Sequence, residues 1–151
     1  MSAAGKKPDL TVVQNAPAAA DAGTIVGPLP IEVPEAVYRV KLSHYTTVFV
    51  FQPKIVLSFG IIDPEIYAGT ELPRWYNART IETHGKRGGR FEVGARSLIV
   101  ADQIRLFGPL TQASLSLDDW RSVDFLAHVE TVEQASTGVR SSVIRRLEIV
   151  K

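Results

Sequence analysis

The sequence predicts a mainly β domain with five strands and one short helix. Segments rich in β-branched and aromatic residues, with apolar and polar side chains in alternation, recur from residue 37 to the end of the chain. All twelve aromatic residues lie between Tyr38 and Phe125, whereas residues 1–34 contain five of the nine prolines and no aromatic residue. Such a segment buries too little apolar surface to offset the entropy lost on ordering. We therefore expect a flexible, disordered arm over residues 1–34, extended near its end, and one domain over residues 35–151.

Three strands are expected in the first half of the domain. Residues 37–51 predict a long, bent strand, residues 54–62 a second, and residues 70–79 a third, whose Pro73 indicates an edge or a bulge. In the first strand a period of two separates a core face from a face that mixes cations with rings. The core face holds Tyr38, Val40 and Leu42, and the other face holds Arg39, Lys41, Ser43, Tyr45, Thr47 and Phe49. The same period places Trp75, Asn77 and Arg79 together in the third strand.

A basic, glycine-rich segment and a helix follow the third strand. Residues 83–96 carry four glycines among their cations, which predicts a mobile basic loop. Apolar residues at helical spacing then predict a helix over residues 97–107, which Ser97 caps and Gly108 ends.

The end of the chain completes the order of elements. A single helical turn is expected just before Trp120, and strands at residues 123–131 and 141–150, where apolar and polar side chains alternate. The order is thus three strands, a helix and two strands, with a long first strand. It matches the five-stranded Greek-key barrel of OB-folds, in which one helix lies between strands three and four and the exposed sheet face binds oligonucleotides.

Composition and spacing exclude most catalytic sites. The chain has no cysteine and only three scattered histidines, so we expect no metal and no cofactor. Residues 85–89 lack the spacing of a phosphate-binding Walker loop, and the carboxylates lack the spacing of a nuclease. Ser43 and His44 are neighbours in a strand and should point to opposite faces. We expect a protein that is not an enzyme. No apolar run or secretory signal is present, which predicts a cytoplasmic protein that does not enter a membrane.

The charges are segregated along the chain, although the net charge is only +1. Residues 74–96 hold six cations against two glutamates, and residues 112–133 hold five carboxylates against one arginine. Aromatic residues lie among the cations, and rings with guanidinium groups are what single-strand binders use to stack bases and follow phosphates. The alternative is that the rings are half core and the cations only keep a loop soluble. The candidate nucleic-acid-binding residues are Arg39, Lys41, Tyr45, Phe49, Arg74, Trp75, Arg79, Lys86, Arg87 and Arg90.

Three segments carry a resemblance to a known group of proteins. They are Tyr38–Tyr45, Lys54–Asp63 and Tyr67–Asn77. They look like small proteins of phages, plasmids and integrative elements, which are similar to OB-fold single-stranded DNA-binding proteins of phages. The resemblance covers residues 36–150 and implies protection of single-stranded DNA during replication, recombination or transfer of a mobile element. The chain lacks the acidic C-terminal tail of the bacterial single-strand binder, so it is not expected to recruit partners through one.

The leading hypothesis is therefore non-enzymatic binding of single-stranded DNA with little sequence preference. RNA stays an alternative ligand, and a homo-oligomer or contacts with replication or recombination proteins stay open. The second hypothesis is a protein-interaction or assembly module that uses exposed aromatic residues and the N-terminal arm. A nuclease-like enzyme is a third.

Overall fold

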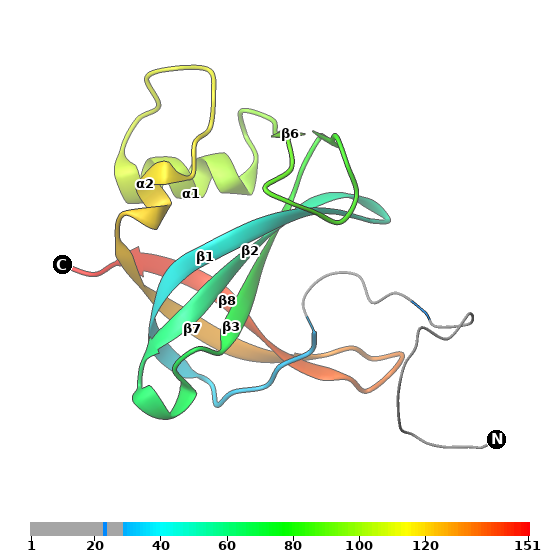
Figure 1. The fold of residues 1–151 in the computed structure, drawn as a ribbon, viewed down its shortest axis with the longest axis vertical. Coiled ribbons are helices and arrows are strands. Elements are labelled where there is room, and N and C mark those ends of the chain that lie inside the picture. The colour runs from blue at the N-terminus through cyan, green and yellow to red at the C-terminus, as the bar shows by residue number, and fades with distance from the viewer. Residues whose placement is uncertain (1–22, 24–28) are drawn as a thin grey trace, which may run out of the picture.

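The computed structural model describes residue 23 and residues 29–151, which form a mainly β structure (Figure 1). An antiparallel sheet of six strands makes up most of it, and a second sheet has two strands. Two helices lie together at one end of the large sheet (Figure 1). The elements are β1 (Ala36–Val50), β2 (Gln52–Asp63), the 3-10 helix η1 (Glu65–Tyr67), β3 (Glu71–Asn77), β4 (Thr80–Ile81), β5 (Lys86–Arg87), β6 (Phe91–Glu92), α1 (Leu98–Phe107), α2 (Asp118–Arg121), β7 (Asp124–Glu133) and β8 (Arg140–Ile149).

The long strand β1 is the centre of the large sheet. The strand order is β3-β2-β1-β7-β8, and β1 pairs with β2 along nearly its whole length. Its first half, from Ala36 to Lys41, also pairs with β7, and Thr46 and Thr47 in its second half pair with β5. The hydrogen-bonded path is open, because β3 and β8 at its two ends are not paired with each other in the described part of the chain. The mainly β class is confirmed, but backbone pairing does not close the sheet into the expected barrel.

A β-bulge in β1 changes which side chains face the core. Leu42 pairs with Phe59, but His44 pairs with Ser58, so Ser43 is an extra residue on β1. Because side chains alternate with a period of two, one extra residue reverses the faces beyond it. Tyr38, Val40 and Leu42 are buried, as predicted, whereas the prediction that Tyr45 and Thr47 share a face with Arg39 and Lys41 is wrong: Tyr45 is half-buried against the core and Thr47 is fully buried.

The basic segment 83–96 is held to β1 rather than mobile. Its strand β5 pairs with β1, and the Gly85 and Gly88 amides donate to the carbonyls of Thr47 and Tyr45 at 2.7 and 2.9 Å. Farther along, β6 pairs with β4 in the small sheet. The mobile-loop prediction is therefore wrong, because β1 offers backbone acceptors that this segment uses.

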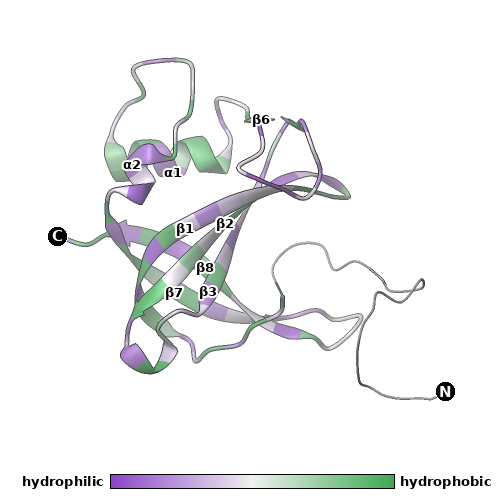
Figure 2. Cartoon of the chain, in the orientation of Figure 1, coloured by the Kyte–Doolittle hydropathy of each residue, from purple (hydrophilic) through white to green (hydrophobic). Residues whose placement is uncertain are grey.

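The core lies between the inner face of the large sheet and the two helices. Apolar and polar residues alternate along the strands (Figure 2), and the apolar ones line this face. Trp120 of α2 is fully buried and packs on Phe125 and Phe107, with ring centroids 5.9 Å apart in both pairs. Helix α1 begins after Ser97 and ends at Gly108, whose φ of 96° permits the turn, as predicted, although the Ser97 side chain makes no capping hydrogen bond. None of the helices within residues 29–151 is long and apolar enough to cross a membrane.

The segment before β1 is packed along β8. Val33 is buried in the core, and its amide donates to Ser142 Oγ at 2.8 Å. The Ser142 amide donates to the carbonyl of Ile31 at 2.7 Å, and Glu32 pairs with Arg140 at 3.0 Å. Residues 29–34 are therefore extended, as expected, but belong to the folded domain. The expected flexible arm otherwise lies outside the described residues.

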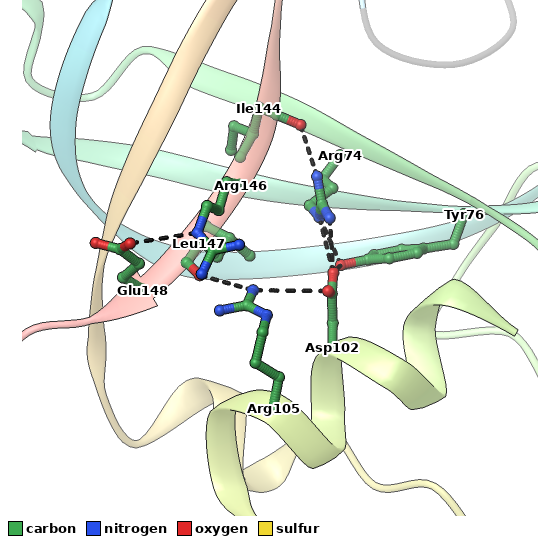
Figure 3. Close-up of polar contacts among 8 residues, drawn as sticks. All are labelled: Arg74, Tyr76, Asp102, Arg105, Ile144, Arg146, Leu147 and Glu148. Atoms are coloured by element: carbon green, nitrogen blue, oxygen red, sulfur yellow. Dashed lines mark hydrogen bonds and ion pairs between the residues drawn. The ribbon is translucent and has the colours of Figure 1, made fainter. Parts of the chain in front are cut away.

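Buried polar side chains connect the two unpaired ends of the sheet (Figure 3). Arg74 of β3 bonds to Asp102 of α1 at 2.7 Å and donates to the carbonyl of Ile144 in β8 at 2.8 Å. The Tyr76 hydroxyl donates to the same carboxylate at 2.6 Å, and burial raises the pKa of this hydroxyl well above its usual range. Burial alone would lower the pKa of Arg74, but Tyr76 and Asp102 together raise it. The guanidinium therefore stays charged and joins β3, α1 and β8.

Removing one partner of this ion pair should be far more damaging than removing both. Asp102→Leu leaves the Arg74 charge buried without a counter-ion, which should lower the free energy of unfolding by about 3–5 kcal/mol. The double variant Arg74→Met, Asp102→Leu should recover much of that loss, since no buried charge remains. Urea unfolding of the wild type, both single variants and the double variant gives the coupling energy. Strictly additive losses would contradict the role assigned to the pair.

Candidate nucleic-acid interface

The structure distributes the predicted binding residues over several places. Arg74 is buried in the network described above, so the prediction that it meets phosphate at the surface is wrong. Arg39 is exposed but its guanidinium binds the Asp124 carboxylate at 2.8 Å, and Lys41 lies two residues farther along the same face of β1. Arg39 and Lys41 therefore lie near β7, on the half of β1 that β5 does not cover.

Tyr45 has a structural role. Its ring packs edge-on against Phe91, with centroids 5.6 Å apart, and its hydroxyl donates to the carbonyl of Gly89 at 3.0 Å. These contacts fix the basic segment to β1. The predicted stacking of Tyr45 on a base would require breaking both contacts, so we do not retain Tyr45 as a stacking residue.

Trp75 belongs to a row of residues that crosses four strands. Arg87 of β5 pairs with Thr46 of β1, Thr46 with Val56 of β2, and Val56 with Trp75 of β3. Directly opposed residues lie on the same face of a sheet, so Arg87 and Trp75 face the same side, roughly 14 Å apart at the usual strand spacing. Trp75 is 37% exposed, whereas its neighbours Arg74 and Tyr76 point into the core. The row therefore places a cation and a partly exposed ring on one face, although Val56 in the row between them is fully buried.

Two further side chains join this surface, which we call the Trp75 face. Lys54 lies one row along, and its ammonium donates to Asn77 Oδ1 at 2.9 Å. His44 lies on the other side of the row, and burial, followed by the charge of Arg87, lowers its pKa below the usual range. Neither residue was predicted; for His44 the reason is that the bulge at Ser43, which turns it to this face, leaves no local signal in the sequence. The Trp75 face consists of His44, Thr46, Lys54, Trp75, Asn77 and Arg87, together with Val56, which is fully buried.

Arg79 and Arg90 lie at a separate hollow. They line a cavity of about 830 Å³ between the small sheet and residues 113–115, together with Phe91. Glu82 and Glu92 line the same cavity, so its charge is balanced. Phe49 is 55% exposed near the turn that joins β1 to β2, and Lys86 is exposed in β5. The structure thus places Trp75 and Arg87 on one face of the sheet, about 14 Å apart, but does not gather the ten predicted residues into one surface.

The bulge also brings Ser43 and His44 into contact, contrary to the sequence expectation. Ser43 Oγ lies 3.1 Å from His44 Nδ1 and donates to Glu71 Oε2 at 3.0 Å. The single hydroxyl proton is then directed to Glu71, so His44 does not act as its base. The arrangement is not a catalytic triad, in which the histidine lies between the serine and the carboxylate. Within the described residues, no three histidine or carboxylate side chains are grouped to hold a metal ion.

Comparison of the chain with protein-family models, with curated proteins and with solved structures found no match.

Gly89 allows the basic segment to lie close to β1. A Cβ at this position would collide with Thr47 Oγ1 and press on the Lys86 side chain. We expect Gly89→Ala to destabilise the domain by about 1–3 kcal/mol, as overpacking of a tight contact does, and to loosen β5. Hydrogen exchange of the Gly85 and Gly88 amides, whose acceptors are on β1, should then become faster.

The control for this prediction is Gly60→Ala on β2. No atom lies within 4 Å of a Cβ added there, so stability and exchange should stay close to wild type. Equal effects of the two substitutions would show that the contact between Gly89 and Thr47 is unimportant.

Proposed function

We propose that this protein binds single-stranded DNA, without catalysis and with little sequence preference, through the Trp75 face. The observation that carries the proposal is the row from Arg87 through Thr46 and Val56 to Trp75. A partly exposed indole can stack on a base of any identity, and a guanidinium about 14 Å away on the same face can bind a phosphate a few nucleotides along the strand. Stacking and phosphate contacts read no sequence, so the binding is sequence-tolerant.

The ion pairs divide the cations into two groups, and Arg87 of the Trp75 face belongs to the group without carboxylate partners within residues 29–151. On β7, β8 and α2 the exposed arginines are paired with carboxylates: Arg121 with Asp118, Arg145 with Glu130, and Arg146 with Glu148. The exposed cations of the basic segment make no ion pair within residues 29–151; they are Arg79, Lys86, Arg87, Arg90 and Arg96. Cations without carboxylate partners are the ones available to replace the counter-ions of a polyanion.

The strand arrangement supports an OB-like fold as part of this proposal. A long β1 pairs with β2 on one side and with β7 on the other, and β3 and β8 end the sheet. Arg74 connects these two end strands through Ile144. In an OB-fold the exposed face of strands two and three binds oligonucleotides, and β3 carries the partly exposed Trp75 here. We propose a cytoplasmic role in replication, recombination or transfer of a mobile element.

Tryptophan fluorescence provides a direct test. The chain has two tryptophans, and Trp120 is fully buried, so a base that stacks on Trp75 should quench only the Trp75 emission. Titration of the full chain with an oligothymidylate of about 12 nucleotides should quench the wild type. Trp75→Phe should lose the quenching. Trp75→Ala should bind the oligonucleotide more weakly, with a binding free energy less favourable by about 1–3 kcal/mol.

The matched control is Trp120→Phe, which should retain the quenching if the domain stays folded by circular dichroism. Wild-type protein that neither quenches nor retards the oligonucleotide in a gel at low salt would refute the proposed function. Ligand-independent self-association in the same samples would instead favour an assembly module, and magnesium-dependent cleavage would favour a nuclease.

Salt dependence tests the unpaired cations. If three to five phosphates are neutralised, the slope of log K against log salt should lie between about −2 and −4, at roughly −0.7 per contact. The triple variant Lys86→Gln, Arg87→Gln, Arg90→Gln should reduce the magnitude of this slope by about 2, with little change in melting temperature. The control removes the same charge from paired arginines, as Arg121→Gln, Arg145→Gln, Arg146→Gln. Equal slopes for the wild type and the first triple variant would remove the basic segment from the site.

A further inference from the structure

Phe51 occupies an unfavourable position at the turn between β1 and β2. Its φ is 63°, in the left-handed region, and it is the one non-glycine residue with a positive φ in the described part of the chain. Val50 pairs with Gln52, so Phe51 alone forms the turn. The Phe51 side chain is 98% exposed. A bulky residue in this conformation is strained, and an exposed ring gains no burial energy in return. Glycine would suit the turn better, so stability does not explain the phenylalanine.

The neighbours of Phe51 connect the turn to the cationic segment. Phe49, two residues away, is also exposed. The Phe49 amide donates to His84 Nδ1 at 2.8 Å, and His84 lies just before Lys86 and Arg87 in the chain. The end of the β1–β2 hairpin therefore carries two exposed rings, and Lys86 and Arg87, which have no carboxylate partner within residues 29–151, pair with β1 four and five positions before Phe51.

We infer that Phe51 is a base-stacking residue, which extends the path of the DNA from Trp75 to the tip of the hairpin. This inference rests on the proposed function. A single strand of DNA supplies bases on which the exposed rings can stack and phosphates that the unpaired cations can bind. A second copy of the chain would bring the same cations to the same place, and like charges oppose such a contact.

The distance between the two rings sets a length requirement. Phe51 lies five positions beyond Thr46, which is in the row of Trp75, and five steps span roughly 16 Å at the rise of a strand, so the two positions are at least that far apart. Stacked nucleotides rise about 3.4 Å each, so a strand of about three nucleotides cannot contact both rings. Phe51 should therefore matter for long oligonucleotides and not for the shortest.

The test is Phe51→Gly in the full chain, which should move stability and binding in opposite directions. The melting temperature should rise, because glycine relieves the left-handed strain. Affinity for an oligothymidylate of about 12 nucleotides should fall roughly fivefold to a hundredfold, as expected for one lost stacking contact, while affinity for one of about three nucleotides stays unchanged. Phe51→Asn, which also tolerates this φ, should repeat the result and guards against an effect of glycine flexibility.

The control is Ile66→Ser in η1, at the other end of β2, where an 81% exposed apolar side chain is removed far from the cations. It should leave affinity unchanged. If Phe51→Gly binds the long oligonucleotide like the wild type while Trp75 is still quenched, the inference about Phe51 is wrong and the proposed function stands. If the wild type binds neither oligonucleotide, both fail. If sedimentation shows that the wild type self-associates and Phe51→Gly does not, the tip is a contact between copies and the inference is overturned.

Discussion

The buried ion pair between Arg74 and Asp102 determines how the two ends of the sheet are held together. Strands β3 and β8 are not paired, so a guanidinium supplies the connection by binding a carboxylate of α1 and a backbone carbonyl of β8. Burying a charge is costly unless it is paired, and here Tyr76 and Asp102 satisfy it. Arg105, which also approaches Asp102 and donates to the carbonyl of Leu147, fastens α1 to the same strand. Since Arg74 and Tyr76 point inward, the alternation of the strand turns Trp75 outward.

That alternation explains which parts of the site were open to prediction. Strands and the main helix followed from local pattern, since apolar periodicity and the Gly108 stop are properties of short segments. The faces of β1 were predictable only as far as Leu42, because the bulge at Ser43 depends on pairing with β2. The error about Arg74 was avoidable. Adjacent residues of a strand face opposite ways, so Arg74 and Trp75 could not both lie on one binding surface.

The basic segment shows why composition misleads about order. Glycines and cations in a run suggest mobility when only the segment itself is considered. In the fold, however, β7 pairs only with the first half of β1 and leaves backbone acceptors along the second half. The amides of Gly85 and Gly88 bond to these carbonyls, and the absence of a Cβ at Gly89 lets the chain pass close to Thr47. Such acceptors exist only once the sheet has formed, and no window of sequence contains them.

The fixed position of the basic segment also helps to explain how a nearly neutral chain could bind a polyanion. Net charge sets the long-range field, but affinity for phosphates depends on local cations whose carboxylates are elsewhere. Here most acidic residues of β7 and β8 form ion pairs with nearby arginines, including Asp124 with Arg39 and Glu130 with Arg145. Fixing Lys86 and Arg87 to β1 also removes most of the entropy that a mobile loop would lose on meeting DNA. Each of these two cations, which face opposite sides of β5, should therefore bind phosphate more tightly than the same residue in a mobile loop, because less ordering remains to be done when the complex forms.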